Sequence, residues 1–72
     1  MPKLPVLKPR EVIAVLERAG FIFERQKGSH RIYIKGNAGV TVPYHSKDMK
    51  RKTLKHIVTQ SGLGLTEFIK RL

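Results

Sequence analysis

Three histidines are the side chains of this chain best suited to moving protons near neutral pH, because imidazole changes its charge in that range. They are His30, His45 and His56. His56 lies between Leu54 and Ile57 in a helical apolar pattern and is predicted to face solvent. His45 follows a Pro-Tyr pair in a predicted loop, where it could bind phosphate, cap the next segment or be solvated.

His30 has the most distinctive setting, because it ends the tetrapeptide Lys27-Gly28-Ser29-His30 and is followed by Arg31. A Gly-Ser pair between two strand-like runs is typical of a two-residue hairpin turn, in which glycine supplies the positive φ. We interpret the stretch as the tip of a β-hairpin that presents His30 to a nucleic-acid backbone. The alternative is a polar turn whose histidine contributes only to solubility.

Two familiar kinds of active site find little support in the sequence. Ser29 stands beside His30, but no obvious acid is placed to orient the imidazole for serine-nucleophile catalysis. The spacing of the three histidines matches no compact set of metal ligands. The carboxylates are scattered along the chain as Glu11, Glu17, Glu24, Asp48 and Glu67. We therefore expect no metal site and no cofactor.

RNA is a substrate that would suit one histidine among cations. Its 2′-hydroxyl can attack the adjacent phosphodiester, so the enzyme needs only a base, an acid and positive charge for the developing phosphorane. General acid–base help contributes ~10²–10⁴-fold, which suffices for a slow nuclease. DNA lacks the 2′-hydroxyl and would not be cut in this way.

Charge narrows the choice of partner. Fifteen Lys and Arg against five Asp and Glu give a formal net charge of +10. An anionic partner would relieve the self-repulsion, and the candidates are nucleic acid, an acidic membrane surface or an acidic protein. The cations are spread over every segment, no Trp can anchor a membrane helix, and the longest apolar run is Phe21-Ile22-Phe23. We expect RNA as partner, no membrane, and a cytoplasmic location.

A basic cluster at Lys50, Arg51 and Lys52 precedes or opens a second predicted helix. The helix dipole disfavours cations there by ~0.3–1 kcal/mol each. Their presence makes sense if the free N–H groups and the cationic heads bind phosphate together. The alternative is a solvated lysine-rich linker. We expect this cluster to lie within reach of His30 across the fold.

Seventy-two residues make one domain, residues 1–72, whose first eight residues are predicted to be an extended or frayed arm. A helix is predicted from Pro9 to about Ala19, with Gly20 as its left-handed stop. Gly62 is predicted to end the second helix, and one or two further helical turns follow. The inner face of the second helix is predicted to carry Leu54, Ile57, Val58 and Ser61.

Three short strands are predicted between the helices, at residues 21–27, 30–35 and 40–42. Ile32 and Ile34 are expected on the packed face of the second strand, and His30 shares their parity. His30 is therefore expected to head the packed face at the edge of the core. The short turns imply an antiparallel meander. The predicted fold is α+β in the order α-β-β-β-α, with a three-stranded antiparallel sheet and helices on one face.

The chain resembles the HicA (YcfA-like) toxin family of bacterial and archaeal toxin–antitoxin pairs. The resemblance covers nearly all residues from Pro9 onward and rests on Ala19-Gly20-Phe21, Lys27-Gly28-Ser29-His30-Arg31-Ile32-Tyr33, Val42-Pro43-Tyr44-His45, Thr53-Leu54-Lys55-His56-Ile57, and Gly62 with Glu67-Phe68. Two departures are visible. Lys52 stands where many members have Gly, and Gly62-Leu63-Gly64-Leu65 is slightly extended.

The resemblance implies a fold like a double-stranded-RNA-binding domain, an mRNA-cleaving activity, a catalytic histidine at position 30 and neutralisation by a HicB antitoxin. It implies no metal cofactor. Our hypothesis is a type II toxin that acts as a metal-independent endoribonuclease, with His30 as general base or acid. The predicted phosphate contacts are Lys27, Arg31, Lys50, Arg51 and Lys52. Ser29 and His45 are further candidates for the site.

Two other functions remain open from the sequence. One is a non-catalytic RNA-binding module on the same fold, which would bind RNA with the same salt sensitivity but would leave it intact. The other is a structural adaptor for an acidic protein, which would not bind RNA at all. Replacing His30 separates the first alternative from the nuclease.

Overall fold

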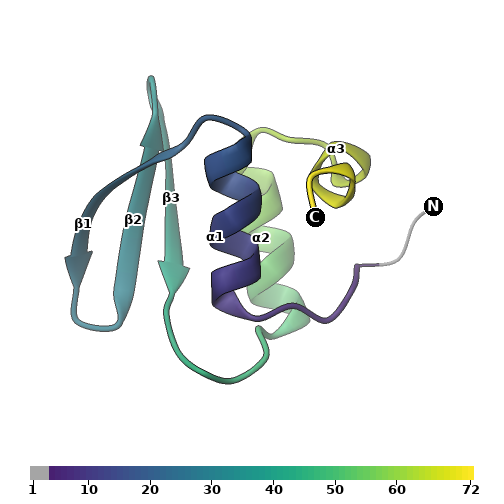
Figure 1. Ribbon diagram of the computed structural model, residues 1–72, viewed down its shortest axis with the longest axis horizontal. Helices are drawn as coiled ribbons and strands as arrows, with labels where there is room; N and C mark the ends of the chain where they lie inside the picture. Colours follow the sequence, from purple (N-terminus) through teal and green to yellow (C-terminus); the bar gives the residue numbers. More distant parts are fainter. Residues whose placement is uncertain (1–3) are drawn as a thin grey trace.

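The computed structural model describes residues 4–72 and shows one helix, three strands and two more helices (Figure 1). The elements are α1 Pro9–Arg18, β1 Ile22–Lys27, β2 His30–Lys35, β3 Ala38–Pro43, α2 Arg51–Ser61 and α3 Leu65–Lys70. The predicted α-β-β-β-α order is confirmed, with α3 as the additional C-terminal turns. The third strand is longer than predicted, because only Gly36 and Asn37 form the turn before it.

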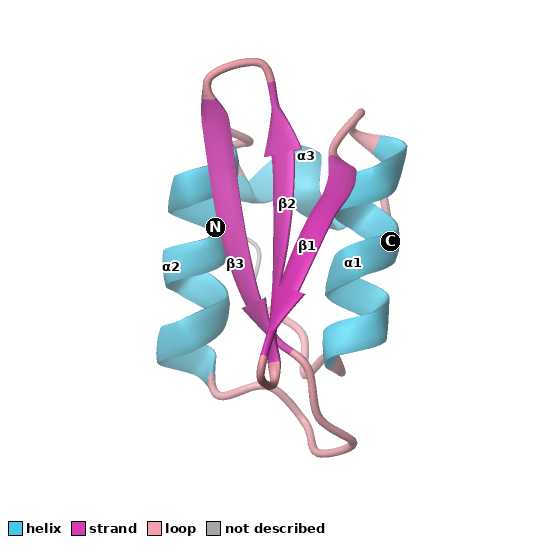
Figure 2. Ribbon diagram, turned by 90° about the vertical axis from the view of Figure 1, so that its left-hand side faces the viewer, coloured by secondary structure: helices cyan, strands magenta, loops and turns pink. Residues whose placement is uncertain are grey.

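The sheet is an antiparallel meander in the order β1-β2-β3. Both longer helices lie against the same face of it, and the opposite face has no helix over it (Figure 2). α3 lies on the far side of the helix pair from the sheet (Figure 1). The fold is therefore the predicted small α+β domain with its helices on one face.

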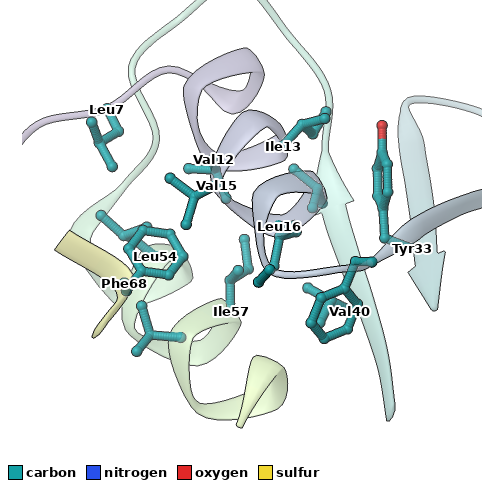
Figure 3. Close-up of a cluster of buried hydrophobic side chains, with 14 of the residues drawn as sticks. Leu7, Val12, Ile13, Val15, Leu16, Tyr33, Val40, Leu54, Ile57 and Phe68 are labelled. Carbon is teal, nitrogen blue, oxygen red and sulfur yellow. The ribbon is translucent and has the colours of Figure 1, made fainter. Parts of the chain in front are cut away.

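The core fills the space between the sheet and the helices (Figure 3). The apolar stripe of α1 is buried, and so is the whole predicted inner face of α2: Leu54, Ile57, Val58 and Ser61. From α3, Phe68 is fully buried on the outer side of the helix pair. Burying each large apolar side chain stabilises the domain by ~1.5–3 kcal/mol, so α3 contributes to the same core as the other elements.

The predicted facing of β2 is wrong. Tyr33 is only 2% exposed and pairs with Val40, which is fully buried. The face toward the helices therefore carries Arg31, Tyr33 and Lys35 in β2. Ile32, Ile34 and His30 lie on the uncovered face instead. The physical reason is that the large Tyr33 side chain is buried in the core with its cross-strand partner Val40, and isoleucine suits a half-exposed strand position equally well.

The end of α1 is closed by a side chain from the sheet. Lys35 Nζ donates a hydrogen bond of 2.6 Å to the carbonyl oxygen of Ala19. Gly20 follows with φ +101°, and a Cβ there would come within 3.2 Å of Lys35 Cε. The predicted glycine stop is thus confirmed, and a cation satisfies a carbonyl group that the helix leaves free.

The N-terminal arm was predicted as residues 1–8, of which the first three lie outside the described residues. From Leu4 to Lys8 the chain has no regular secondary structure. Leu7 is nevertheless buried, and its carbonyl oxygen accepts a 2.7 Å hydrogen bond from the backbone N–H of Met49. This part of the arm is therefore attached to the segment that precedes α2. In residues 4–72 no helix is both long and apolar enough to cross a membrane.

Candidate functional site

One end of the molecule collects most of the candidate residues, because the chain reverses direction at each element. Both longer helices begin there, the β1–β2 turn lies there, and β3 ends there (Figures 1 and 2). We call it the basic end; its cations are Lys8, Arg10, Lys27, Arg31, Lys47, Lys50, Arg51 and Lys52. The positive ends of two helix dipoles add to this charge, so the basic end favours anions.

The β1–β2 turn has the predicted form. Gly28 has φ +60°, and no non-glycine residue from 4 to 72 has a positive φ. A glycine with positive φ at the first central position is the requirement of a type II′ hairpin turn. Gln26 Nε2 donates a 2.9 Å hydrogen bond to the Gly28 carbonyl oxygen. The Ser29 carbonyl oxygen accepts a 2.6 Å hydrogen bond from the Tyr44 backbone N–H, which attaches the turn to the end of β3.

His30 is the first residue of β2 and is exposed on the uncovered face of the sheet. It pairs directly with Lys27 of β1 on one side and with Pro43 of β3 on the other. Directly opposite residues have Cβ atoms roughly 4.5–5.5 Å apart. The imidazole of His30 is thus open to solvent, with a cationic side chain as its nearest cross-strand neighbour.

Arg31 lies on the other face of β2 from His30. Its guanidinium carbon is 3.8 Å from the ring centroid of Tyr44 and 5.9 Å from that of Phe23. Its Nε donates a 3.1 Å hydrogen bond to Gln26 Oε1. Such cation–π contacts are worth ~0.5–1 kcal/mol each at exposed sites. Arg31 therefore holds the Tyr44 ring, a positioning role that the sequence did not suggest.

His45 follows Tyr44 in the loop between β3 and α2 and is exposed. With Tyr44 and Ser46 it lines a hollow whose other wall is formed by Lys8 and Arg10. Sequence reasoning missed these two cations because they lie far from His45 along the chain. Their position on either side of Pro9, at the start of a predicted helix, is the signal that could have identified them. The cluster of Lys50, Arg51 and Lys52 lies at the start of the other predicted helix in the same way.

The basic cluster of Lys50, Arg51 and Lys52 lies at the start of the second helix, as predicted. Lys50 is the N-cap residue with an extended backbone, Arg51 begins the helix, and no acidic side chain lies in the first turn. In α1, by contrast, the Lys8 backbone N–H donates a 2.9 Å hydrogen bond to the Glu11 carboxylate. The cluster lies at the basic end with His30 but in the helix layer, with the loop of residues 44–49 between them (Figure 1).

Metal-binding side chains do not gather in the part of the chain that the structure describes. Residues 4–72 hold no group of three or more His, Cys, Asp or Glu side chains placed to bind a metal ion. His56 is exposed on α2 among Lys52, Thr53, Lys55 and Thr59, with no carboxylate among those neighbours. At the basic end the carboxylates Glu11 and Asp48 are outnumbered by cations.

Comparison with known protein families agrees with this architecture. A family model described as the HicA toxin of bacterial toxin–antitoxin systems matches residues 9–63. The chain belongs to the HicA toxin family. The matched span begins with α1 and ends just beyond α2, so it includes the turn, His30, the β3–α2 loop and the basic start of α2. A search of curated proteins finds no match.

Membership places this HicA chain as the toxin of a toxin–antitoxin pair, and its partner is accordingly an antitoxin. α3 lies outside the matched span but is attached to it. Arg18 Nη1 of α1 donates a 2.5 Å hydrogen bond to the Arg71 carbonyl oxygen just after α3. Together with the buried Phe68, this contact makes α3 a structural part of the HicA domain.

Proposed function

We propose that this HicA toxin is a metal-independent endoribonuclease that cleaves mRNA in the cytoplasm, with His30 as the group that moves the proton. One observation carries the proposal. The imidazole of His30 is exposed on the uncovered face of the sheet, paired with Lys27, at the end of the molecule where the cations and two helix N-termini gather. An RNA backbone drawn to that end would meet an accessible imidazole.

The proposed reaction needs no nucleophile from the protein. The RNA 2′-oxygen forms a bond to the adjacent phosphorus and loses its proton, while the bond from phosphorus to the 5′-oxygen breaks and that oxygen gains a proton. The products are a 2′,3′-cyclic phosphate and a 5′-hydroxyl. His30 serves as the base for the first proton or the acid for the second, and the Lys27 ammonium stabilises the negative charge that develops on phosphorus oxygens.

The other cations would hold the RNA on either side of the cleaved bond. Lys50, Arg51 and Lys52 would bind phosphates at the start of α2, where the helix dipole and free N–H groups also favour an anion. Arg31 would contact phosphate through the guanidinium nitrogens that Gln26 does not use. Ser29 and His45 are secondary candidates: both are exposed and lie in the turn and the loop that the Tyr44 backbone N–H joins.

The partner we propose is a HicB-like antitoxin that covers His30 with an acidic surface. The uncovered face that carries His30 also carries the half-buried Ile32 and Ile34 and, farther from His30, Ile22, which pairs with Ile34 and is 63% exposed. An apolar strip edged by cations suits a protein that brings both apolar side chains and carboxylates. Such a partner would block the substrate and lower the self-repulsion of the +10 domain.

The proposal is tested by comparing the cleavage of a defined RNA by purified wild-type and His30→Ala proteins, each with and without chelator. The matched control is His56→Ala, which removes an exposed imidazole from α2. We expect wild type and His56→Ala to cleave equally with chelator present, and His30→Ala to lose at least ~10²-fold, the lower range for acid–base catalysis. An RNA with a single 2′-deoxy nucleotide at the cleaved position should stay intact.

The remaining functions are outcomes of the same experiment. RNA that stays intact with wild type, while binding is retained, would replace the nuclease with a non-catalytic RNA-binding module. Cleavage that disappears only on chelation would mean a metal nuclease. Absence of any RNA binding would favour an adaptor for an acidic protein.

A further inference from the structure

The hollow between the start of α1 and the loop after β3 has the composition of a nucleotide subsite. Lys8 and Arg10 contribute from the start of α1, and Tyr44, His45 and Ser46 contribute from the chain after β3. Its volume is about 290 Å³. This is just below the usual range for ligand sites, roughly 300–1,000 Å³, so the hollow suits a fragment no larger than one nucleotide.

The two walls of the hollow are each fixed to the fold. On one side Tyr44 is held by the Arg31 guanidinium 3.8 Å from its ring centroid and by its 2.6 Å backbone hydrogen bond to Ser29. On the other side Leu7, next to Lys8, accepts the 2.7 Å hydrogen bond from Met49. The loop is therefore anchored at both ends. A fixed site costs less ordering free energy when a ligand binds.

The charge of the hollow is purely positive. None of its five lining residues carries a carboxylate. The nearest acid along the chain, Glu11, has its carboxylate hydrogen-bonded to the Lys8 backbone N–H and lines a different hollow, with Leu7 and Ala14. Two cations thus face the hollow without an acidic partner among its walls, which is the arrangement that a phosphate group requires.

The aromatic side chains make the hollow more specific than a simple anion site. Tyr44 is partly exposed and lines the hollow together with His45. Proteins that bind single strands combine a positively charged track for the phosphates with aromatic rings on which bases stack. The hollow thus combines cationic residues from one segment with aromatic residues from another.

We infer that this hollow binds one nucleotide of a single-stranded RNA, with its phosphate on Lys8 and Arg10 and its base against the Tyr44 ring. The inference rests on the proposed function for the choice of RNA as ligand, but it does not depend on cleavage. The Tyr44 backbone N–H is bonded to the Ser29 carbonyl oxygen, so the hollow is connected to the turn that precedes His30. Tyr44 and Arg10 are positioning residues of the toxin.

The test uses adenosine monophosphate as the probe, with adenosine and inorganic phosphate as separate arms. Amide chemical shifts of the full-length His30→Ala protein are followed by NMR as each probe is added. We expect millimolar adenosine monophosphate to shift residues 8–10 and 44–46, and to bind more tightly than either of its parts. Tyr44→Leu removes the ring on which the base would stack. It should weaken binding about five- to tenfold, the low end of measured stacking contributions. Tyr44→Phe, which keeps the ring, should bind like its parent.

Removing a phosphate contact gives an independent readout. Arg10→Gln should weaken adenosine monophosphate binding and lower the salt slope for a non-cleavable 2′-deoxy oligonucleotide by about 0.7. Lys70→Gln, which removes an exposed cation of α3, is the matched control and should leave adenosine monophosphate binding unchanged.

Shifts elsewhere in the protein, or equal affinity for inorganic phosphate and adenosine monophosphate, would overturn the nucleotide subsite. So would unchanged binding in both Tyr44→Leu and Arg10→Gln. The two proposals fail separately. Intact RNA with wild type while residues 44–46 still respond to adenosine monophosphate would refute the nuclease and keep the subsite; cleavage without such a response would do the reverse.

Discussion

At the scale of single residues, the uncovered face of the sheet decides what His30 can do. An imidazole on the packed face would be covered by the helices and could have only a structural role. Here it stands in solvent, beside a lysine across the strand pair and at the end of a turn held by Gln26 and Tyr44. This combination of access, positive charge and a fixed backbone is what a proton-transfer group acting on a phosphodiester needs.

Lys27 gives a prediction at this scale. Its ammonium would act on charge that develops only in the transition state, so Lys27→Gln should lower kcat by about tenfold while KM changes little. The control is Lys55→Gln, which removes the same charge from the exposed face of α2. Steady-state cleavage of a short fluorescent RNA separates the two constants. An equal loss in both variants would show that only overall charge matters.

Gly28 gives a second prediction. A Cβ there would meet nothing within 4 Å, so the cost of Gly28→Ala comes entirely from holding alanine at φ +60°. That cost is about 1–2 kcal/mol. Gly39→Ala is the control, because Gly39 also has open space but no positive φ. Denaturant midpoints should fall for Gly28→Ala and stay nearly level for Gly39→Ala. Gly28→Asn should lie between them, since asparagine adopts a positive φ more readily than alanine.

At the scale of elements, α3 is the least expected contributor to stability. It lies outside the span matched by the HicA family model, yet Phe68 is fully buried. Phe68→Ala should cost about 3–5 kcal/mol, as large-to-small changes in cores do. A domain of this size has only roughly 4–11 kcal/mol in total. The expected result is a large drop in the unfolding midpoint, measured by circular dichroism, with Leu72→Ala as the nearly neutral control.

A pH-dependent contact lies on the surface of the same helix. The hydrogen bond from Arg71, with the charge of Lys70, lowers the pKa of Glu67 below its usual range. A carboxyl whose folded pKa is depressed stabilises the fold at neutral pH and loses that contribution as pH falls through the folded value. Glu67 is exposed, so the effect on stability is small and screened by salt. An NMR titration should show the pKa of Glu67 rising in Arg71→Gln; an unchanged value would refute the contact.

The elements also show why sequence reasoning reached the fold but not the whole site. Helical periodicity identified the inner face of α2 residue by residue, because apolar residues that recur every 3.6 positions line up along one face of a helix. Alternation in β2 was ambiguous, since Ile32 and Ile34 are as apolar as Tyr33, and the facing depended on Val40 across the strand pair. The hollow at Tyr44 could not be predicted from the sequence for a related reason. Its walls come from segments more than thirty residues apart and meet through the Leu7–Met49 hydrogen bond.

At the scale of the whole molecule, topology concentrates charge. The chain direction alternates through α1, β1, β2, β3 and α2, so two helix starts and one hairpin tip must share an end. The molecule measures 33 × 28 × 17 Å, so many cations at that end lie within a Debye length of one another, which is ~10 Å at 0.1 M salt. The same placement that would attract RNA therefore also places like charges close together in the free toxin.

Salt should then act in opposite directions on stability and on RNA binding. Raising the sodium chloride concentration screens the repulsion, so the Tm of the free toxin should rise. RNA affinity should fall, because releasing counterions from the RNA is less favourable at higher salt. The triple change Lys50→Gln, Arg51→Gln and Lys52→Gln lowers the formal charge from +10 to +7 and should flatten both dependences. Its control neutralises three cations away from the basic end: Arg25→Gln, Lys55→Gln and Lys70→Gln. If both triple variants flatten RNA binding equally, net charge rather than the basic end attracts the RNA. A Tm that falls with salt would mean that the cations are already compensated within the fold, and that an acidic antitoxin has no repulsion to relieve.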